Sequence, residues 1–130
     1  MSTRSKAAAY KRRRNARRKA RLKGALQGAA YNCSYLTYHQ CSHITNLPEG
    51  ANYLDKLLEM RMAYDAKRNR PPLSALCVGV NTDVPGKGFD DAYHLHYPNE
   101  RKIPDIKMNP QGRAMRLRQI QVDVWAHYCK

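Results

Sequence analysis

Acidic residues are missing from the first third of this chain. Residues 1–48 contain 11 Lys or Arg and no Asp or Glu, whereas the remaining residues contain 13 Lys or Arg and all 10 acids. The formal net charge of +14 is therefore carried mainly by one end of the sequence. A cationic segment attached to an otherwise ordinary composition indicates a polyanionic partner, with nucleic acid first and an anionic membrane surface second.

Long apolar runs are absent as well. No stretch approaches the roughly 18–20 residues that a membrane-spanning helix needs. The alanines at residues 7–9 are too few for the apolar region of a signal peptide. We therefore expect no membrane partner and a cytoplasmic location, which is the host cytoplasm if the protein is phage-encoded.

Cysteine is sparse, with four residues that lie far apart in the sequence. We interpret them as reduced thiols rather than as a disulfide framework. Cys33, Cys41, His39 and His43 are soft ligand types, but they lack the closely paired spacing that is typical of zinc sites. Cys77 lacks the adjacent His or Arg that activates a nucleophilic thiol. The sequence therefore predicts no metal, no cofactor and no catalytic cysteine.

Residues 1–30 are interpreted as an arginine-rich arm. Their Ala, Arg, Lys, Leu and Gln residues favour a helix, but the cations repel one another with no acid one turn away to relieve them. We expect the arm to be frayed alone in water and to become a continuous helix on a polyanion. Gly24 and Gly28, with Ala29 and Ala30, predict a hinge to a domain of residues 31–130.

The candidate nucleic-acid contacts are the cations of this arm and two arginines of a second basic patch near the C-terminus. They are Lys11, Arg12, Arg13, Arg14, Arg17, Arg18, Lys19, Arg21, Lys23, Arg113 and Arg116. Guanidinium groups suit this role because they make bidentate contacts to phosphate or guanine and stack on bases. Tyr10 and Tyr31 are candidate stacking groups, whereas Tyr35 and Tyr38 are assigned to core packing.

The arm also carries a family resemblance. The sequence R-R-R-N-A-R-R-K at residues 12–19, preceded by alanines, resembles the arginine-rich peptide of lambdoid phage N antiterminators. This resemblance implies a bent helix that binds a small RNA hairpin. The composition of the arm does not distinguish RNA from DNA, so both remain alternatives.

Helical patterns dominate the rest of the chain. Ser34 or Thr37 is a candidate N-cap for a short helix over residues 38–44. The spacing from Asn46 to Glu49 is that of a helix start, and apolar residues then recur every three or four positions up to Lys67. A similar stripe predicts a third helix over residues 111–129. The fold class expected is α+β and mostly helical.

Residues 73–80 are a short apolar run between prolines and turn residues, which predicts a strand buried on both faces. A glycine loop follows, and aromatic or apolar residues at positions 93, 95 and 97 alternate with histidines, which predicts another strand over residues 93–97. Residues 98–110 are expected to form an irregular loop. The segment P-P-L-S-A-L-C-V-G-V-N-T-D-V-P-G-K-G-F at residues 71–89, after T-Y-H-Q at residues 37–40, resembles a winged-helix-like domain of phage and bacterial proteins.

That resemblance implies a winged-helix body with residues 82–89 as the wing, a layout similar to the DNA-binding domain of alkylguanine alkyltransferases. The sequence thus predicts a non-enzymatic RNA- or DNA-binding protein with an N-terminal basic arm and a winged-helix-like domain. One alternative is a protein-interaction module that acts on a host polymerase, ribosome or nuclease. Another is a metal-dependent nuclease that uses Asp90 or Asp91 with Glu100 and Lys102.

Overall fold

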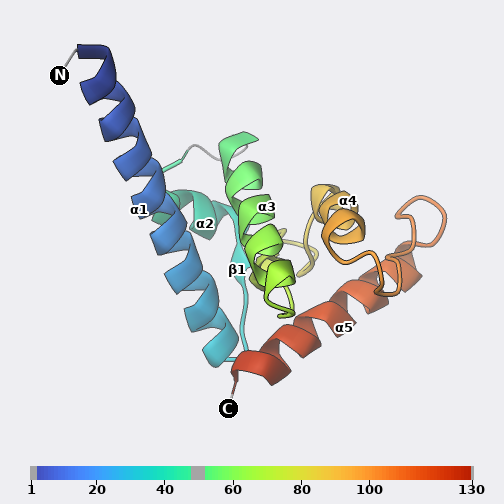
Figure 1. The fold of residues 1–130 in the computed structure, drawn as a ribbon. Coiled ribbons are helices and arrows are strands. Elements are labelled where there is room, and N and C mark those ends of the chain that lie inside the picture. Colours follow the sequence, from blue (N-terminus) through green and yellow to red (C-terminus); the bar gives the residue numbers. More distant parts are fainter. Residues whose placement is uncertain (1–2, 48–51, 130) are drawn as a thin grey trace.

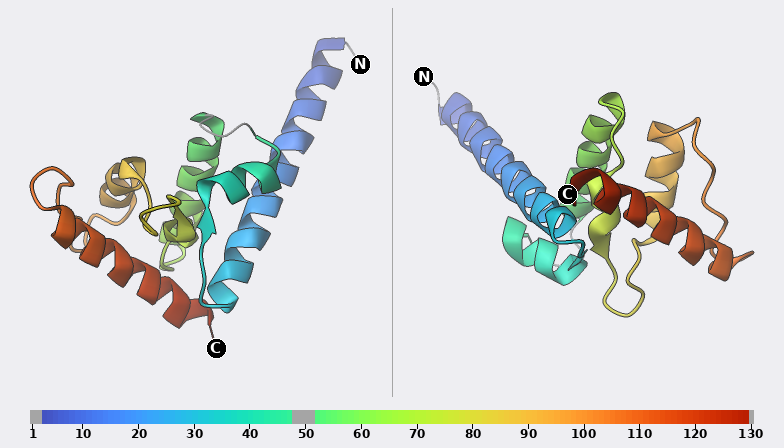
Figure 2. Two further views of the ribbon diagram at one scale, coloured as in Figure 1. Left: turned by 180° about the vertical axis from the view of Figure 1, so that it is seen from behind. Right: turned by 90° about the horizontal axis from the view of Figure 1, so that it is seen from below.

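The computed structural model describes residues 3–47 and 52–129 and has the mostly helical α+β architecture expected from the sequence. Its elements are α1 (Thr3–Tyr31), β1 (Leu36–Thr37), α2 (Tyr38–Thr45), α3 (Asn52–Lys67), the 3-10 helix η1 (Leu73–Leu76), β2 (Cys77–Val78), α4 (Lys87–His96) and α5 (Pro110–Tyr128). α1 and α5 form the two sides of a V that meet at their C-terminal ends, and α3 lies between them (Figures 1 and 2). α2 packs against α1, and α4 packs against α3.

The hydrophobic core lies where α1, α3 and α5 converge on η1. Each helix contributes side chains that recur every three or four residues, as an amphipathic helix requires. The largest of these apolar side chains with almost no exposed surface are Leu22, Leu26, Leu57, Met62, Leu73, Leu76, Leu117, Ile120 and Val124. The predicted apolar stripes are confirmed where these helices are described, because Leu54, Leu58 and Met62 of α3 and Leu117, Ile120 and Val124 of α5 are all buried.

The arm and the body share one helix. α1 is helical from Thr3 to Tyr31 and runs through Gly24 and Gly28, so the hinge expected there is wrong. Leu22 and Leu26 are 1% and 0% exposed, and burial of two leucines on one helical face contributes several kcal/mol of stabilisation. This burial outweighs the helix penalty of two glycines, which is about 2 kcal/mol. The compact body therefore includes the second half of the segment that the sequence assigns to the arm.

Two predicted strands are corrected. Residues 73–80 form η1 and only two strand residues, Cys77 and Val78, which pair in parallel with Leu36 and Thr37. The partner strand β1 has only two residues, so this segment can form only a short run of strand hydrogen bonds. Residues 73–78 are buried as expected, whereas Val80 is 66% exposed and does not belong to the buried run. The backbone carbonyl of Ala75 accepts a hydrogen bond from the Gln121 side chain at 3.0 Å.

Residues 93–97 are not a strand, because α4 continues to His96. The alternating tyrosines also satisfy a four-residue helical spacing that starts at Phe89. The Phe89 and Tyr93 rings stack at 5.7 Å, and the Tyr93 and Tyr97 rings stack at 4.9 Å. This segment therefore follows the four-residue period of a helix and not the two-residue period of a strand. α4 begins at Lys87, within residues 82–89, which the resemblance assigns to a wing.

The helix caps agree with the sequence in part. Thr37 caps α2 in a capping box, because its side chain accepts from the Gln40 amide at 3.1 Å and Gln40 accepts from the Thr37 amide at 2.9 Å. Asn46 does not begin the next helix: it ends α2 in the left-handed conformation, with a φ of 56°. Glu49 lies outside the described residues. The irregular loop over residues 98–109 is confirmed, and Asn109 caps α5.

Cys33 and Cys129 form a disulfide, which corrects the expectation of four reduced thiols. The two cysteines are 96 residues apart in sequence, so spacing gave no indication that they pair. α1 ends in a turn in which Cys33 takes a φ of 52° and the Ser34 amide donates to the Ala29 carbonyl at 2.8 Å. This turn directs Cys33 toward the end of α5. Cys41 and Cys77 are buried free thiols.

Removal of this disulfide is expected to lower the free energy of unfolding by about 2–4 kcal/mol, because the bond closes a long loop in the unfolded chain. Urea denaturation of the protein with and without dithiothreitol measures the difference. The double variant Cys33→Ser/Cys129→Ser provides the control, since dithiothreitol should leave its stability unchanged. Equal stability of the wild-type protein in both conditions would contradict the prediction.

Candidate nucleic-acid interface

The first half of α1 is a cationic helix with little cover from the body. Over residues 5–21 every side chain is exposed except three that are partly buried, Ala9, Asn15 and Arg18. Its N-terminal part extends beyond the other helices (Figure 1). The predicted contacts in this segment are therefore accessible, and Lys23 is partly buried where the helix joins the body.

The exposed segment carries cations on every side, because arginines occupy three consecutive positions from Arg12 to Arg14 and two more at Arg17 and Arg18. At 1.5 Å per residue it extends for about 25 Å, which is less than one turn of a nucleic-acid duplex. The segment is therefore a cationic rod about 25 Å long that contains no acidic side chain. The expected fraying of the arm in dilute solution stays a prediction.

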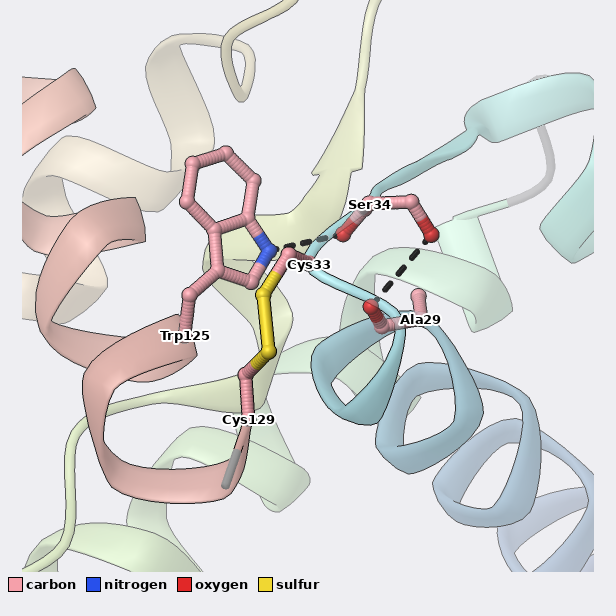
Figure 3. The surroundings of a disulfide bond; sticks show 5 residues. All are labelled: Ala29, Cys33, Ser34, Trp125 and Cys129. Atoms are coloured by element: carbon pink, nitrogen blue, oxygen red, sulfur yellow. Dashed lines mark hydrogen bonds between the residues drawn. A yellow bond between two sulfur atoms is a disulfide. The ribbon is translucent and has the colours of Figure 1, made fainter.

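The base of α1 is fixed to α5 by a disulfide, a hydrogen bond and an aromatic contact, of which Figure 3 shows the first two. Beside the disulfide, the Trp125 indole donates to the Ser34 carbonyl at 2.8 Å, and the Ser34 hydroxyl donates to the Ala29 carbonyl at 3.3 Å. Tyr31 and Tyr128 meet edge to face with 6.0 Å between ring centroids. These contacts constrain the direction in which the exposed half of α1 leaves the body.

Arg113 and Arg116 do not belong to this interface, which corrects their assignment. They are 5% and 7% exposed. The Arg113 guanidinium donates to both carboxylate oxygens of Asp90, at 2.7 and 3.0 Å, and to the Pro85 carbonyl. Arg116 donates to the Arg101 carbonyl and to the Tyr93 hydroxyl. Both arginines therefore hold α5 to α4 and to the adjoining loops.

The tyrosines divide as the sequence predicts. Tyr10 and Tyr31 are 60% and 58% exposed, so both remain available for stacking. Tyr35 packs near Trp125. The Tyr38 hydroxyl accepts a hydrogen bond from the Gly86 amide at 3.1 Å, and burial raises the pKa of Tyr38 to about 12. Its role is to hold the turn before α4 against α2.

The residues considered for catalysis or metal binding are distributed through the fold. Both carboxylate oxygens of Asp90 are engaged by Arg113, whereas Asp91 and Glu100 are exposed. A hydrogen bond with Cys41, together with burial, raises the pKa of the Cys77 thiol well above its usual range. Within residues 3–47 and 52–129 no group of three His, Cys, Asp or Glu side chains is placed to hold a metal ion.

Three basic residues near the end of α3 were missed by the sequence prediction. Arg61, Arg68 and Arg70 surround the half-exposed ring of Tyr64. Arg61, Tyr64 and Arg68 are three and four residues apart, which places them on one helical face. This spacing is present in the sequence, but cations are favourable near the C-terminal end of any helix, so basic residues there do not by themselves indicate a binding site.

Comparisons with protein-family models, with curated proteins and with solved structures find no match for this chain.

Proposed function

We propose that this protein binds nucleic acid through the exposed half of α1 while the remainder of the chain fixes the position of that helix. One observation carries the proposal: residues 5–21 form an accessible helix rich in arginine and free of acids, built onto a compact body by the second half of the same helix. The segment contains no acidic side chain to neutralise its positive charge, so the phosphates of a nucleic acid are suitable counterions.

The uneven distribution of charge along the chain supports the arm as the part that attracts a nucleic acid. All 10 acidic residues follow residue 48, so the body is close to neutral while the arm is strongly cationic. A polyanion is therefore attracted to one end of the molecule, and encounter is oriented before contact. Arginine in the arm further favours a ligand that offers both phosphates and base edges.

We keep the winged-helix resemblance of the body only as a likeness in the order of its elements. The order of α2, α3 and β2 supports it. The paired strands β1 and β2 are parallel, however, whereas a wing built as a hairpin pairs antiparallel strands. We therefore assign recognition to the arm and give the body the role of positioning it, with no groove-reading helix in the body.

Electrophoretic mobility shifts with matched single-stranded, duplex and hairpin probes, each made in RNA and in DNA, test the proposal. We expect binding to at least one duplex or hairpin form and a steep decrease in affinity as salt is raised. Deletion of residues 1–20, which leaves Leu22 and Leu26 in place, should abolish the shift without unfolding the body. Affinity that is independent of salt would overturn the proposal.

A protein-interaction module is the second candidate, and α5 carries the observation that favours it. Met115 and Val122 are 69% and 49% exposed and lie seven positions apart, on one face of the helix. This candidate would be supported by a protein that still copurifies after nuclease digestion but no longer copurifies with the Met115→Ser/Val122→Ser variant. A partner lost on digestion would instead support nucleic-acid binding.

A further inference from the structure

A cluster of cations surrounds the ring of Tyr64, which is 39% exposed near the C-terminal end of α3. The guanidinium carbons of Arg68, Arg61 and Arg70 lie 3.4, 4.1 and 5.5 Å from the ring centroid. The positive charge of Arg68 is the main cause that lowers the pKa of the Tyr64 phenol, and Lys23 of α1 acts in the same direction. We call these five residues the Tyr64 cluster.

The Tyr64 cluster is held in place by the interior of the protein. Asp65 is fully buried, and its carboxylate binds Arg61 at 3.1 Å and Arg70 at 3.8 Å while accepting the Leu73 amide. Arg68 donates to the Tyr64 carbonyl at 3.1 Å. Because these groups are already ordered, a ligand loses little additional conformational entropy from them when it binds.

The charge of the cluster is not balanced by this carboxylate. Asp65 is one anion beside Arg61 and Arg70, and Arg68 and Lys23 add two further positive charges. The surplus indicates an anionic ligand. Arg68 and Arg61 lie so close to the ring centroid that they cover the two faces of Tyr64, and Arg68 is exposed. The outer plane of the Arg68 guanidinium, backed by the ring, is therefore a surface on which an unpaired base can stack while its phosphate binds a nearby cation.

The cluster continues the surface of the arm. Lys23 belongs to α1 and follows Arg21, the last exposed cation of the arm, by two residues. α1 contacts α3, and the two helices converge toward the closed end of the V (Figure 1). Tyr128 lies close enough to Arg61 and Arg70 for their charges to affect its phenol, and it contacts the exposed ring of Tyr31. An aromatic pair, Tyr31 and Tyr128, therefore lies at the base of the arm.

From this arrangement we infer that the Tyr64 cluster binds an unpaired, single-stranded segment of the nucleic acid whose paired region is held by α1. This inference rests on the proposed function and adds the class of ligand: a duplex or hairpin with a single-stranded extension. An acidic peptide would use the cations but would gain nothing from the ring and the guanidinium planes, so the aromatic component favours nucleotides.

The test compares one hairpin in two forms, blunt and with a single-stranded extension, each made in RNA and in DNA. The wild-type protein should bind the extended form about tenfold more tightly, the effect of stacking one base. Tyr64→Leu should remove this preference and leave affinity for the blunt hairpin unchanged, whereas Tyr64→Phe should retain it. Thermal unfolding of each variant verifies that it is folded.

Arg68→Gln serves as a second variant, because Arg68 is exposed and its loss leaves the buried Asp65 contacts intact. It should reduce the preference, whereas Lys67→Gln, which removes one exposed charge from the adjacent position, should not. Equal affinity of the wild-type protein for both hairpins, or an equal loss on both in Tyr64→Leu, overturns this inference alone. Failure to bind either hairpin overturns the proposed function as well.

Discussion

Substitution of Arg12, Arg13, Arg14 and Arg17 by glutamine is expected to weaken nucleic-acid binding by about a hundredfold to a thousandfold near 0.1 M salt. All four side chains are exposed on the projecting half of α1. Glutamine keeps the helix propensity of the segment, so the variant changes charge rather than conformation. Removing four neighbouring cations also relieves their mutual repulsion, which leaves the helix no less stable.

The salt dependence separates phosphate contacts from other effects. Each lost contact should reduce the slope of log affinity against log salt by about 0.7–0.9, so four lost contacts reduce it by about 3. A fluorescence anisotropy titration at several salt concentrations measures both quantities. Because phosphate contacts carry no sequence information, the loss should be similar for probes of different sequence.

A matched control removes the same charge from the body. Lys56, Lys87, Lys102 and Lys107 are exposed and distributed over α3, α4 and the loop before α5, and we expect their substitution by glutamine to change affinity less than fivefold, roughly. An equal loss in both variants would mean that net charge, and not the arm, determines binding. That result would contradict the proposed interface.

Arg113→Met is expected to have the second large effect, and on stability rather than binding. The substitution leaves Asp90, which is 7% exposed, without the guanidinium that now binds both of its oxygens. Breaking a buried ion pair by removing one partner costs about 3–5 kcal/mol. Urea denaturation measures the change in free energy of unfolding, and binding by the fraction that remains folded should be close to that of the wild type.

Two comparisons make the prediction specific. Arg17→Met removes an exposed arginine and should change stability by less than about 0.5 kcal/mol while it weakens binding. The double variant Asp90→Asn/Arg113→Met should recover part of the lost stability, because no unpaired charge is then buried. An Arg113→Met protein with wild-type stability and weakened binding would return Arg113 to the nucleic-acid interface.

These predictions depend on a distinction between arginines that local sequence does not make. The pattern around Arg113 and Arg116 suggested a basic surface patch, in the same way as the pattern around Arg12 and Arg13. Burial depends on which other elements approach a helix, and the partner of Arg113 lies 23 residues earlier in the chain. The short-range periodicity of the sequence cannot predict such a contact.

Local sequence was sufficient where a local interaction determined the outcome. The cap of α2 by Thr37, one of the two N-cap candidates, and the apolar stripe of α5 both depend on residues within a few positions of one another, and both are present in the structure. The pattern of residues 93–97 was ambiguous, because Tyr93 and Tyr97 fit the two-residue period of a strand and also, together with Phe89, the four-residue spacing of a helical face. Only packing of the stacked rings selected the helical alternative.

By itself, the amino-acid sequence determined the charge of this protein, its concentration in the first third of the chain and the mostly helical class, because these follow from composition and short-range spacing. The tertiary structure decided that α1 belongs to the core from Leu22 onward and that Cys33 pairs with Cys129. It also decided that the second basic surface surrounds Tyr64 rather than Arg113. Each of these depends on contacts between residues distant in the chain, and such contacts form only when the helices pack together.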